Sequence, residues 1–258
     1  MERRKGRMGD GPLLRQVSKG PLDNNGDPAS RKLRVVCESC NNGWMSRLQD
    51  KAKPVLIPLL TNERWQLDWE SQKALASWIT MFSLVYSQGA PEGCASYEED
   101  FRRFASTQEP FNWWLISIGM YTGNDWRTRI ETYSSFVKYG YGSPFQPKTP
   151  TRVNTEATTA VIGSLLIHTF FSAEFPVGIL QEGYPGSTFH QVFNLYQIWP
   201  PARTEITPTR GLINDTDATR IARSFAAMDL HGLKRETLIQ RTSHKGKVSV
   251  RAEKSISG

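Results

Sequence analysis

Apolar residues in the first part of the chain recur every three or four positions, as Leu75 and Ile79 do. This spacing is typical of an amphipathic helix, which buries one side and exposes the other. It predicts one helix over residues 44–59, a second over residues 69–86, and a third that begins near residue 96. We therefore expect the first part of the chain to be helical.

Short polar residues mark the expected helix starts. Asp68 is a good N-cap for the second helix. Ser96 is followed three residues later by Glu99, which is the spacing of a capping box. Pro54 and Pro58 fall inside the first helical pattern. Because proline lacks a backbone N–H, we expect these two residues to kink or break that helix.

Beyond residue 110 the pattern becomes typical of strands. β-branched and aromatic residues fill four runs separated by glycine and proline clusters. These runs cover residues 112–121, 127–139, 158–171 and 192–199. A last helix is expected after Asp215 or Asp217, followed by a frayed tail. This order predicts an α+β fold, with a zinc-knuckle-like segment and helices first, then a mainly antiparallel sheet and a C-terminal helix.

The distribution of charge divides the chain into three regions. We expect a partial zinc-knuckle-like region at residues 1–66, an α+β body at residues 67–231 and a basic tail at residues 232–258. Residues 1–36 carry nine Lys/Arg and four Asp/Glu, a net charge of +5. The tail carries seven Lys/Arg and two Asp/Glu, also a net charge of +5. The whole chain is +7, which leaves −3 for residues 37–231. Basic ends suit contact with a phosphate backbone, although short solvated tails show the same pattern.

Length and composition fit a globular protein. Apolar residues make up 38% and charged residues 22% of the 258 residues. No apolar run reaches the roughly 20 residues that cross a bilayer. The basic cluster at residues 3–7 is not followed by the apolar segment of a secretory signal. With three cysteines and no such signal, we expect a cytoplasmic protein without a membrane partner.

Cys37 and Cys40 have the spacing of a metal-ligand pair. A structural zinc needs four ligands, but residues 1–36 contain neither cysteine nor histidine, and the next candidates are Cys94 and His168. Three interpretations stay open: a remote residue completes the site, a second chain completes it, or the pair binds no metal. A redox Cys-x-x-Cys is a further alternative. The sequence therefore predicts an incomplete zinc site.

The run VVCESCNNGWMSRLQDKAKPVLIPLL, at residues 35–60, resembles the second half of HNH-endonuclease-related proteins of bacteria and phages. The later segments QKALASW and LYQIWP are also similar to that group. The resemblance implies a ββα unit around one divalent metal. It also implies that Cys37 and Cys40 are structural zinc ligands. Asn41 then takes the place of a catalytic residue that binds the metal or orients a neighbour.

The resemblance also implies residues that this chain lacks. In the family a first cysteine pair and an Asp-His or Glu-His pair lie upstream, but residues 1–36 contain neither. Phosphodiester cleavage by this chain is therefore doubtful, and nucleic-acid binding is the expected function. Zinc is the expected structural metal, with magnesium or manganese as the cofactor of an active nuclease. The alternative is a non-enzymatic protein-binding or inhibitor protein, for example a phage-borne one.

The four histidines show no catalytic pattern. His168 falls in the apolar run Leu165–Phe170 and is expected to be a core residue. His190, His231 and His244 lie in loop-like or tail segments without a visible partner. We therefore assign none of them to a site.

Overall fold

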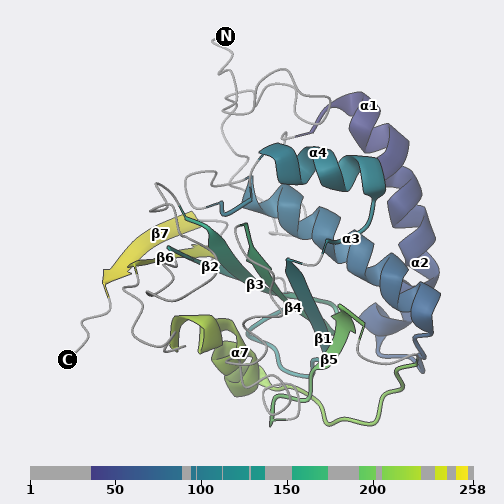
Figure 1. Ribbon diagram of the computed structural model, residues 1–258. Coiled ribbons are helices and arrows are strands. Elements are labelled where there is room, and N and C mark those ends of the chain that lie inside the picture. Colours follow the sequence, from purple (N-terminus) through teal and green to yellow (C-terminus); the bar gives the residue numbers. More distant parts are fainter. Residues whose placement is uncertain are drawn as a thin grey trace, which may run out of the picture.

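The computed structural model describes residues 36–88, 94–96, 98–111, 113–127, 129–136, 153–173, 192–201, 205–227, 236–242 and 248–254. These residues form an α+β fold in which one antiparallel sheet lies between two unequal helical layers (Figure 1). The predicted order of helices, antiparallel sheet and late helix is confirmed. Residues 1–35, which belong to the expected zinc-knuckle-like region at residues 1–66, lie outside the described residues.

A long helical segment opens the described part of the chain. α1 (Glu38–Cys40), the π-helical turn η2 (Asn41–Met45) and α2 (Ser46–Thr61) follow one another directly. The backbone leaves helical geometry at Gly43, where φ is −98° and ψ is −111°. The departure from regular helix therefore lies at a glycine, which carries no side chain to oppose it.

Pro54 and Pro58 lie inside α2, and the helix continues through both. The prediction that they would break the helix is wrong. Their positions face outward, since Pro54 is exposed and Pro58 is half-buried. The buried stripe that includes Leu56 and Leu59 holds the segment in helical form. Tertiary packing of this kind outweighs the local preference of single residues.

α3 (Trp69–Ser87) lies between α2 and the sheet, and α4 (Glu98–Thr107) lies on the same side (Figure 1). Asp68 caps α3, because its Oδ1 accepts a hydrogen bond from the Ser71 N–H at 2.8 Å. This confirms the predicted cap. No helix in the described stretches is long and apolar enough to cross a bilayer.

All pairings in the sheet are antiparallel, and the strand order is β5-β1-β4-β3-β2-β6-β7. The strands are β1 (Trp114–Met120), β2 (Ile130–Phe136), β3 (Thr155–Ile162), β4 (Leu165–Ser172), β5 (Tyr196–Trp199), β6 (Glu236–Thr242) and β7 (Val248–Lys254). The mainly antiparallel sheet that the sequence predicted is thus present.

The run predicted as one strand over residues 158–171 is a hairpin of β3 and β4. The chain turns at Gly163, whose φ of +59° favours glycine. A Cβ there would lie 2.6 Å from the carbonyl oxygen of Leu60. The next residue, Ser164, donates its N–H to that same oxygen at 2.9 Å. The turn is therefore fixed by contact with the end of α2, which a local pattern does not reveal.

The basic C-terminal region also differs from its prediction. Instead of a frayed tail, β6 and β7 form an antiparallel pair, and β6 joins β2 along its whole length. Val248–Lys254 contains three charged residues, Arg251, Glu253 and Lys254, and charge of this kind is typical of an edge strand that is protected from pairing with other chains. The sheet therefore extends into the region that we expected to be irregular.

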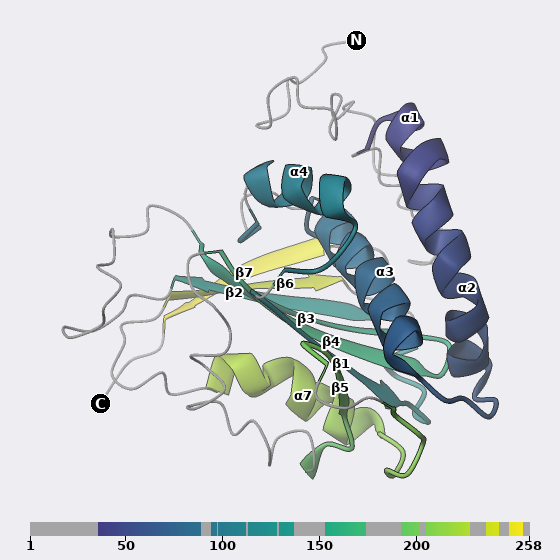
Figure 2. The ribbon, with the colours of Figure 1, turned by 45° about the vertical axis from the view of Figure 1, so that its right-hand side comes forward.

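α7 (Asp215–Ala227) covers the face of the sheet opposite α3 (Figure 2). Alternation along β4 divides its side chains between the two faces. Ile167 and Phe171 belong to the apolar cluster on the α3 side, whereas Leu166 and Phe170 belong to the cluster on the α7 side. The sheet thus separates two apolar cores.

Candidate functional site

The cysteine pair lies at the start of the long helical segment. Cys37 has an extended backbone, with φ −72° and ψ 154°, and it is the N-cap of α1. Its Sγ accepts a hydrogen bond from the Cys40 backbone N–H at 3.1 Å. The hydroxyl of Ser39 lies 3.2 Å from the same sulfur. The two thiols, both reduced, therefore lie on one turn of the chain.

The thiols pack inward, while the residues after them face solvent. Cys37 is 5% exposed and Cys40 is 7% exposed, and both belong to the apolar cluster on the α3 side. Asn41 and Asn42 are exposed, and the Asn41 amide donates to the Asn42 side-chain oxygen at 3.4 Å. Asn41 thus presents a polar group to solvent beside the buried pair.

Two thiols supply half of the ligands that a structural zinc requires. In the part of the chain that the structure describes, no three Cys, His, Asp or Glu side chains come close enough to hold a metal ion. Residues 1–36 contain no cysteine or histidine. The described residues therefore do not form a closed zinc site. Zinc at Cys37 and Cys40, and magnesium or manganese beside Asn41, stay predictions.

Cys94, the third cysteine, belongs to a different environment. Its thiol donates to the Ser87 hydroxyl at 3.4 Å and lies 3.7 Å from the Ser96 carbonyl oxygen. Burial, followed by the nearby carboxyl of Glu156, raises the pKa of this thiol to about 12. Among the described residues, Cys94 does not come together with Cys37 and Cys40 as a metal-binding group.

His168 is a buried residue of β4, 2% exposed, as the sequence predicted. Its Nδ1 lies 2.8 Å from the Thr159 hydroxyl on the neighbouring strand. Its side chain belongs to the face of the sheet that α7 covers, whereas the cysteine pair packs on the α3 side. The other three histidines lie outside the described residues.

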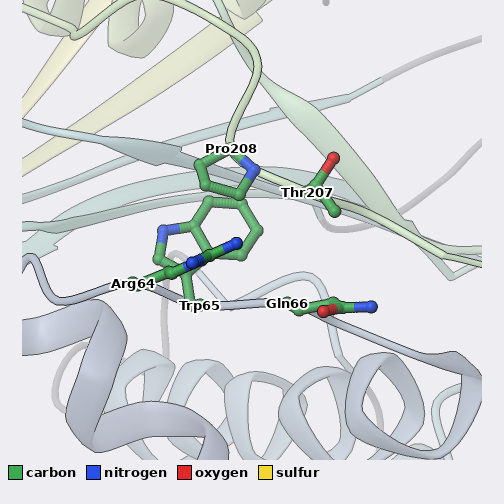
Figure 3. Close-up of a pocket in the computed structure, with 5 residues that line it drawn as sticks. All are labelled: Arg64, Trp65, Gln66, Thr207 and Pro208. Atoms are coloured by element: carbon green, nitrogen blue, oxygen red, sulfur yellow. The ribbon is translucent and has the colours of Figure 1, made fainter.

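A shallow pocket lies at the other end of α2, more than 20 Å of helix away from the cysteine pair by the usual rise per residue. It has a volume of about 540 Å³ and forms where the loop after α2 meets the segment after β5 (Figure 3). Its lining residues are Arg64, Trp65, Gln66, Thr207 and Pro208. None of these five residues is a carboxylate, thiol or imidazole, so the Thr207 hydroxyl has no general base among them.

The pocket walls are held together by backbone pairing. Leu67 donates its N–H to the Ile206 carbonyl at 2.9 Å, and Ile206 returns a bond to Leu67 at 2.8 Å. Trp65 is largely buried and contacts Tyr196 edge-on, with ring centroids 5.5 Å apart. No local pattern in the sequence predicts this pocket, because its two sides are about 140 residues apart in the chain.

Comparison with known proteins adds no relative. A scan against protein-family models, a search of curated proteins and a search of solved structures each found no match to this chain.

Proposed function

We propose that this protein binds nucleic acid without cleaving it, as a relative of the HNH endonucleases. The observation that carries the proposal is the arrangement of residues 37–42. Two thiols with metal-ligand spacing pack inward on one turn, and Asn41 directly after them is exposed. This matches the order of residues on which the resemblance rests. An exposed amide next to a helix start is also a common donor to phosphate oxygens.

The charge of the chain supports contact with a polyanion. Residues 1–36 and 232–258 each carry a net charge of +5, whereas the residues between them carry −3. Lysine and arginine that neutralise phosphates release counterions, which supplies most of the affinity of non-specific binding. β6 and β7 attach the second basic region to the edge of the sheet. Basic groups in both of these regions of the sequence therefore favour binding that depends on salt.

The absence of cleavage is inferred from the missing chemistry. A metal-dependent nuclease needs a base that activates water and a metal that stabilises the leaving oxygen. Within the described stretches, His168 is buried in the sheet and no three side chains form a metal-binding group. Residues 1–36 supply no histidine. Asn41 alone can orient a ligand, but it cannot take up a proton.

Plasmid DNA tests both parts of the proposal in one experiment. The purified protein is incubated with supercoiled plasmid and Mg²⁺, Mn²⁺ or Zn²⁺, and binding and nicking are read on native gels. We expect retarded plasmid that stays supercoiled with every metal. Nicking that disappears in Cys40→Ala and persists in the control Cys94→Ala would contradict the absence of cleavage. A plasmid that is neither retarded nor nicked would contradict the whole proposal.

A non-enzymatic protein-binding role is the second candidate. It is favoured by two large apolar side chains at the surface, Ile57 at 53% and Trp69 at 48% exposure, near the connection of α2 to α3. Exposed apolar groups of this size are common at protein interfaces. A protein captured by the wild type but lost with Trp69→Ala, with chelator having no effect, would favour this role.

A further inference from the structure

Glu156 is a carboxyl group buried inside the fold. It lies in β3 and is 5% exposed. Its register partners are Ser134 on β2 and Phe171 on β4, neither of which carries a charge. Phe171 belongs to the apolar cluster on the α3 side, so the Glu156 side chain lies on that face of the sheet. Buried carboxylates usually have a cationic partner, so this one calls for an explanation.

The described contacts of Glu156 are hydrogen bonds from neutral groups. The backbone N–H of Ala95 donates to Oε2 at 3.2 Å, and the Thr158 hydroxyl forms a second bond. The Thr158 hydroxyl also lies 3.0 Å from the Thr132 hydroxyl on β2. Among the residues that the structure describes, the Cys94 thiol is a titratable group that interacts with this carboxyl. No described lysine, arginine or histidine contributes to the pKa of Glu156.

Residues 94–96 connect this carboxyl to α3. Cys94, Ala95 and Ser96 are all buried, at 6%, 0% and 7% exposure. The Cys94 thiol donates to the Ser87 hydroxyl, and the Gln88 amide donates to the Cys94 sulfur, each at 3.4 Å. The segment is thus held on one side by weak thiol contacts to the end of α3. On the side that faces β3, the segment is held by the hydrogen bond from the Ala95 N–H to Glu156.

The charge state of Glu156 is finely balanced. Burial raises its pKa from the ordinary value of 4.5 to about 7, although the bonds from Ala95 and Thr158 act in the opposite direction. The Glu156 carboxylate is, after burial, the second cause that raises the pKa of the Cys94 thiol. An ionised Glu156 would therefore place an uncompensated negative charge between β3 and residues 94–96.

We propose that Glu156 is a protonation-controlled latch: the neutral carboxyl holds residues 94–96 against β3, and ionisation releases them and makes the Cys94 thiol reactive. The release lets the carboxylate reach water, which removes the cost of a buried charge. The described hydrogen bonds that opening breaks are the Ala95 bond and the weak contacts of the Cys94 thiol, so opening can stay local. Ionisation adds no reagent and breaks no covalent bond.

The direction of the pH dependence follows from the two states. In the closed state the carboxyl titrates near 7, and in the open state it returns to about 4.5. The open state therefore loses its proton first as the pH rises. The opening equilibrium should increase about tenfold per pH unit between these two values and level off above about pH 7. Between about pH 5 and pH 7 the increase is roughly fortyfold, because the dependence flattens close to each of the two pKa values.

Amide hydrogen exchange at Ala95 and alkylation of Cys94, both read by peptide mass spectrometry, measure the opening. Rates are divided by those of the unfolded chain at the same pH, and wild type is compared with Glu156→Gln. The control is Glu99→Gln, an exposed residue of α4. In wild type and the control we expect both corrected rates to rise roughly fortyfold from about pH 5 to pH 7. Glu156→Gln should stay slow throughout.

Two results would overturn the latch. One is a corrected Ala95 exchange rate in wild type that does not change over this pH range. This measurement uses the wild-type protein alone, so it does not depend on the folding of a variant. The other is a folded Glu156→Gln protein whose corrected rates rise with pH as steeply as those of wild type, because no carboxyl is then present to ionise.

Discussion

The two faces of the sheet are built in different ways. On the α3 side, three helices and the start of the long helical segment share one large apolar cluster. On the α7 side, a single helix covers a smaller cluster, and polar groups run across the sheet beneath it. The aligned buried residues are Ser117, His168, Thr159 and Glu131, on four neighbouring strands. The first face depends on packing, and the second also depends on specific hydrogen bonds.

Asp215 shows how α7 is attached. Its carboxylate accepts bonds from the Tyr121 hydroxyl, from the Asn124 N–H at 3.1 Å and from the Asp125 N–H at 2.9 Å. A Cβ on Gly123 would lie 2.5 Å from this carboxylate, so only glycine fits there. One side chain at the start of α7 thus holds the loop after β1. The stability of the α3 face should therefore depend on the volume of its buried side chains. The stability of the α7 face should depend on single polar groups.

The sharpest test of this difference uses the same substitution on both faces. Ile79 in α3 and Ile221 in α7 are both fully buried. We expect Ile79→Ala to lower the free energy of unfolding by about 4 kcal/mol and Ile221→Ala by about 2 kcal/mol. The reason is that α3 lies between α2 and the sheet, so a cavity there cannot collapse easily. Urea unfolding measures both, and equal losses would contradict the comparison.

Glu156 introduces a polar exception into the α3 face. Because its folded pKa is raised, the unfolded chain ionises first, and the free energy of unfolding should fall as the pH rises from 4.5 to about 7. The contribution lost is at most about 3 kcal/mol, and it stays lost above this range. The free energy of unfolding of Glu156→Gln should equal that of wild type at about pH 4 and exceed it at about pH 8. Urea unfolding at the two pH values checks this, and a parallel dependence in both proteins would refute it.

On the α7 face, Asp215→Asn should lower the free energy of unfolding by about 2 kcal/mol, since it removes a charge that accepts three hydrogen bonds. The control is Asp217→Asn, whose ion pair with Arg220 spans 3.8 Å and should contribute less than about 0.5 kcal/mol. Burial raises the pKa of Asp215, but its hydrogen bonds lower it further, so the net shift is downward. The difference between the variants should therefore shrink as the pH falls through and below 3.8. A difference that persists in acid would be evidence against this attachment.

The smallest effect concerns the cap at Cys37. Cys37→Ser keeps a side chain that accepts the Cys40 N–H, whereas Cys37→Ala removes it. We expect Cys37→Ala to lower the free energy of unfolding by about 1 kcal/mol and Cys37→Ser to have less effect. Thermal unfolding of metal-free protein measures both. If serine is as destabilising as alanine, the capping role of Cys37 is wrong.

The sequence revealed the α3 side better than the α7 side, for a physical reason. Helical spacing and the Asp68 cap are local, so α3 was predicted nearly to its ends. The turn at Gly163 depends on Leu60, and the pairing of β6 with β2 depends on residues a hundred positions apart. Contacts of this kind have no local signal. Pro54 and Pro58 wrongly predicted a break in α2, because the packing of the helix outweighs the backbone hydrogen bonds that proline cannot donate.

The candidate site was predicted in part. The sequence marked Cys37 and Cys40 as a pair, and the structure places both on one turn of the chain. Nothing in the spacing indicated that both thiols would be buried in the apolar cluster. The Glu156 contact with Ala95 joins residues 61 positions apart and could not be expected from either segment alone. Chemistry that depends on one strand meeting one loop is visible only in the folded chain.

Nucleic-acid binding is tested most directly by fluorescence anisotropy of a labelled DNA duplex at a series of salt concentrations. We expect binding at about 50 mM salt that weakens at least a hundredfold by about 200 mM. Replacing the four basic residues Arg3, Arg4, Lys5 and Arg7 by glutamine should reduce the salt slope by about 3, while the control Arg47→Gln on α2 should reduce it by less than about 1. No binding at the lowest salt, or a salt slope that the four replacements leave unchanged, would contradict the account.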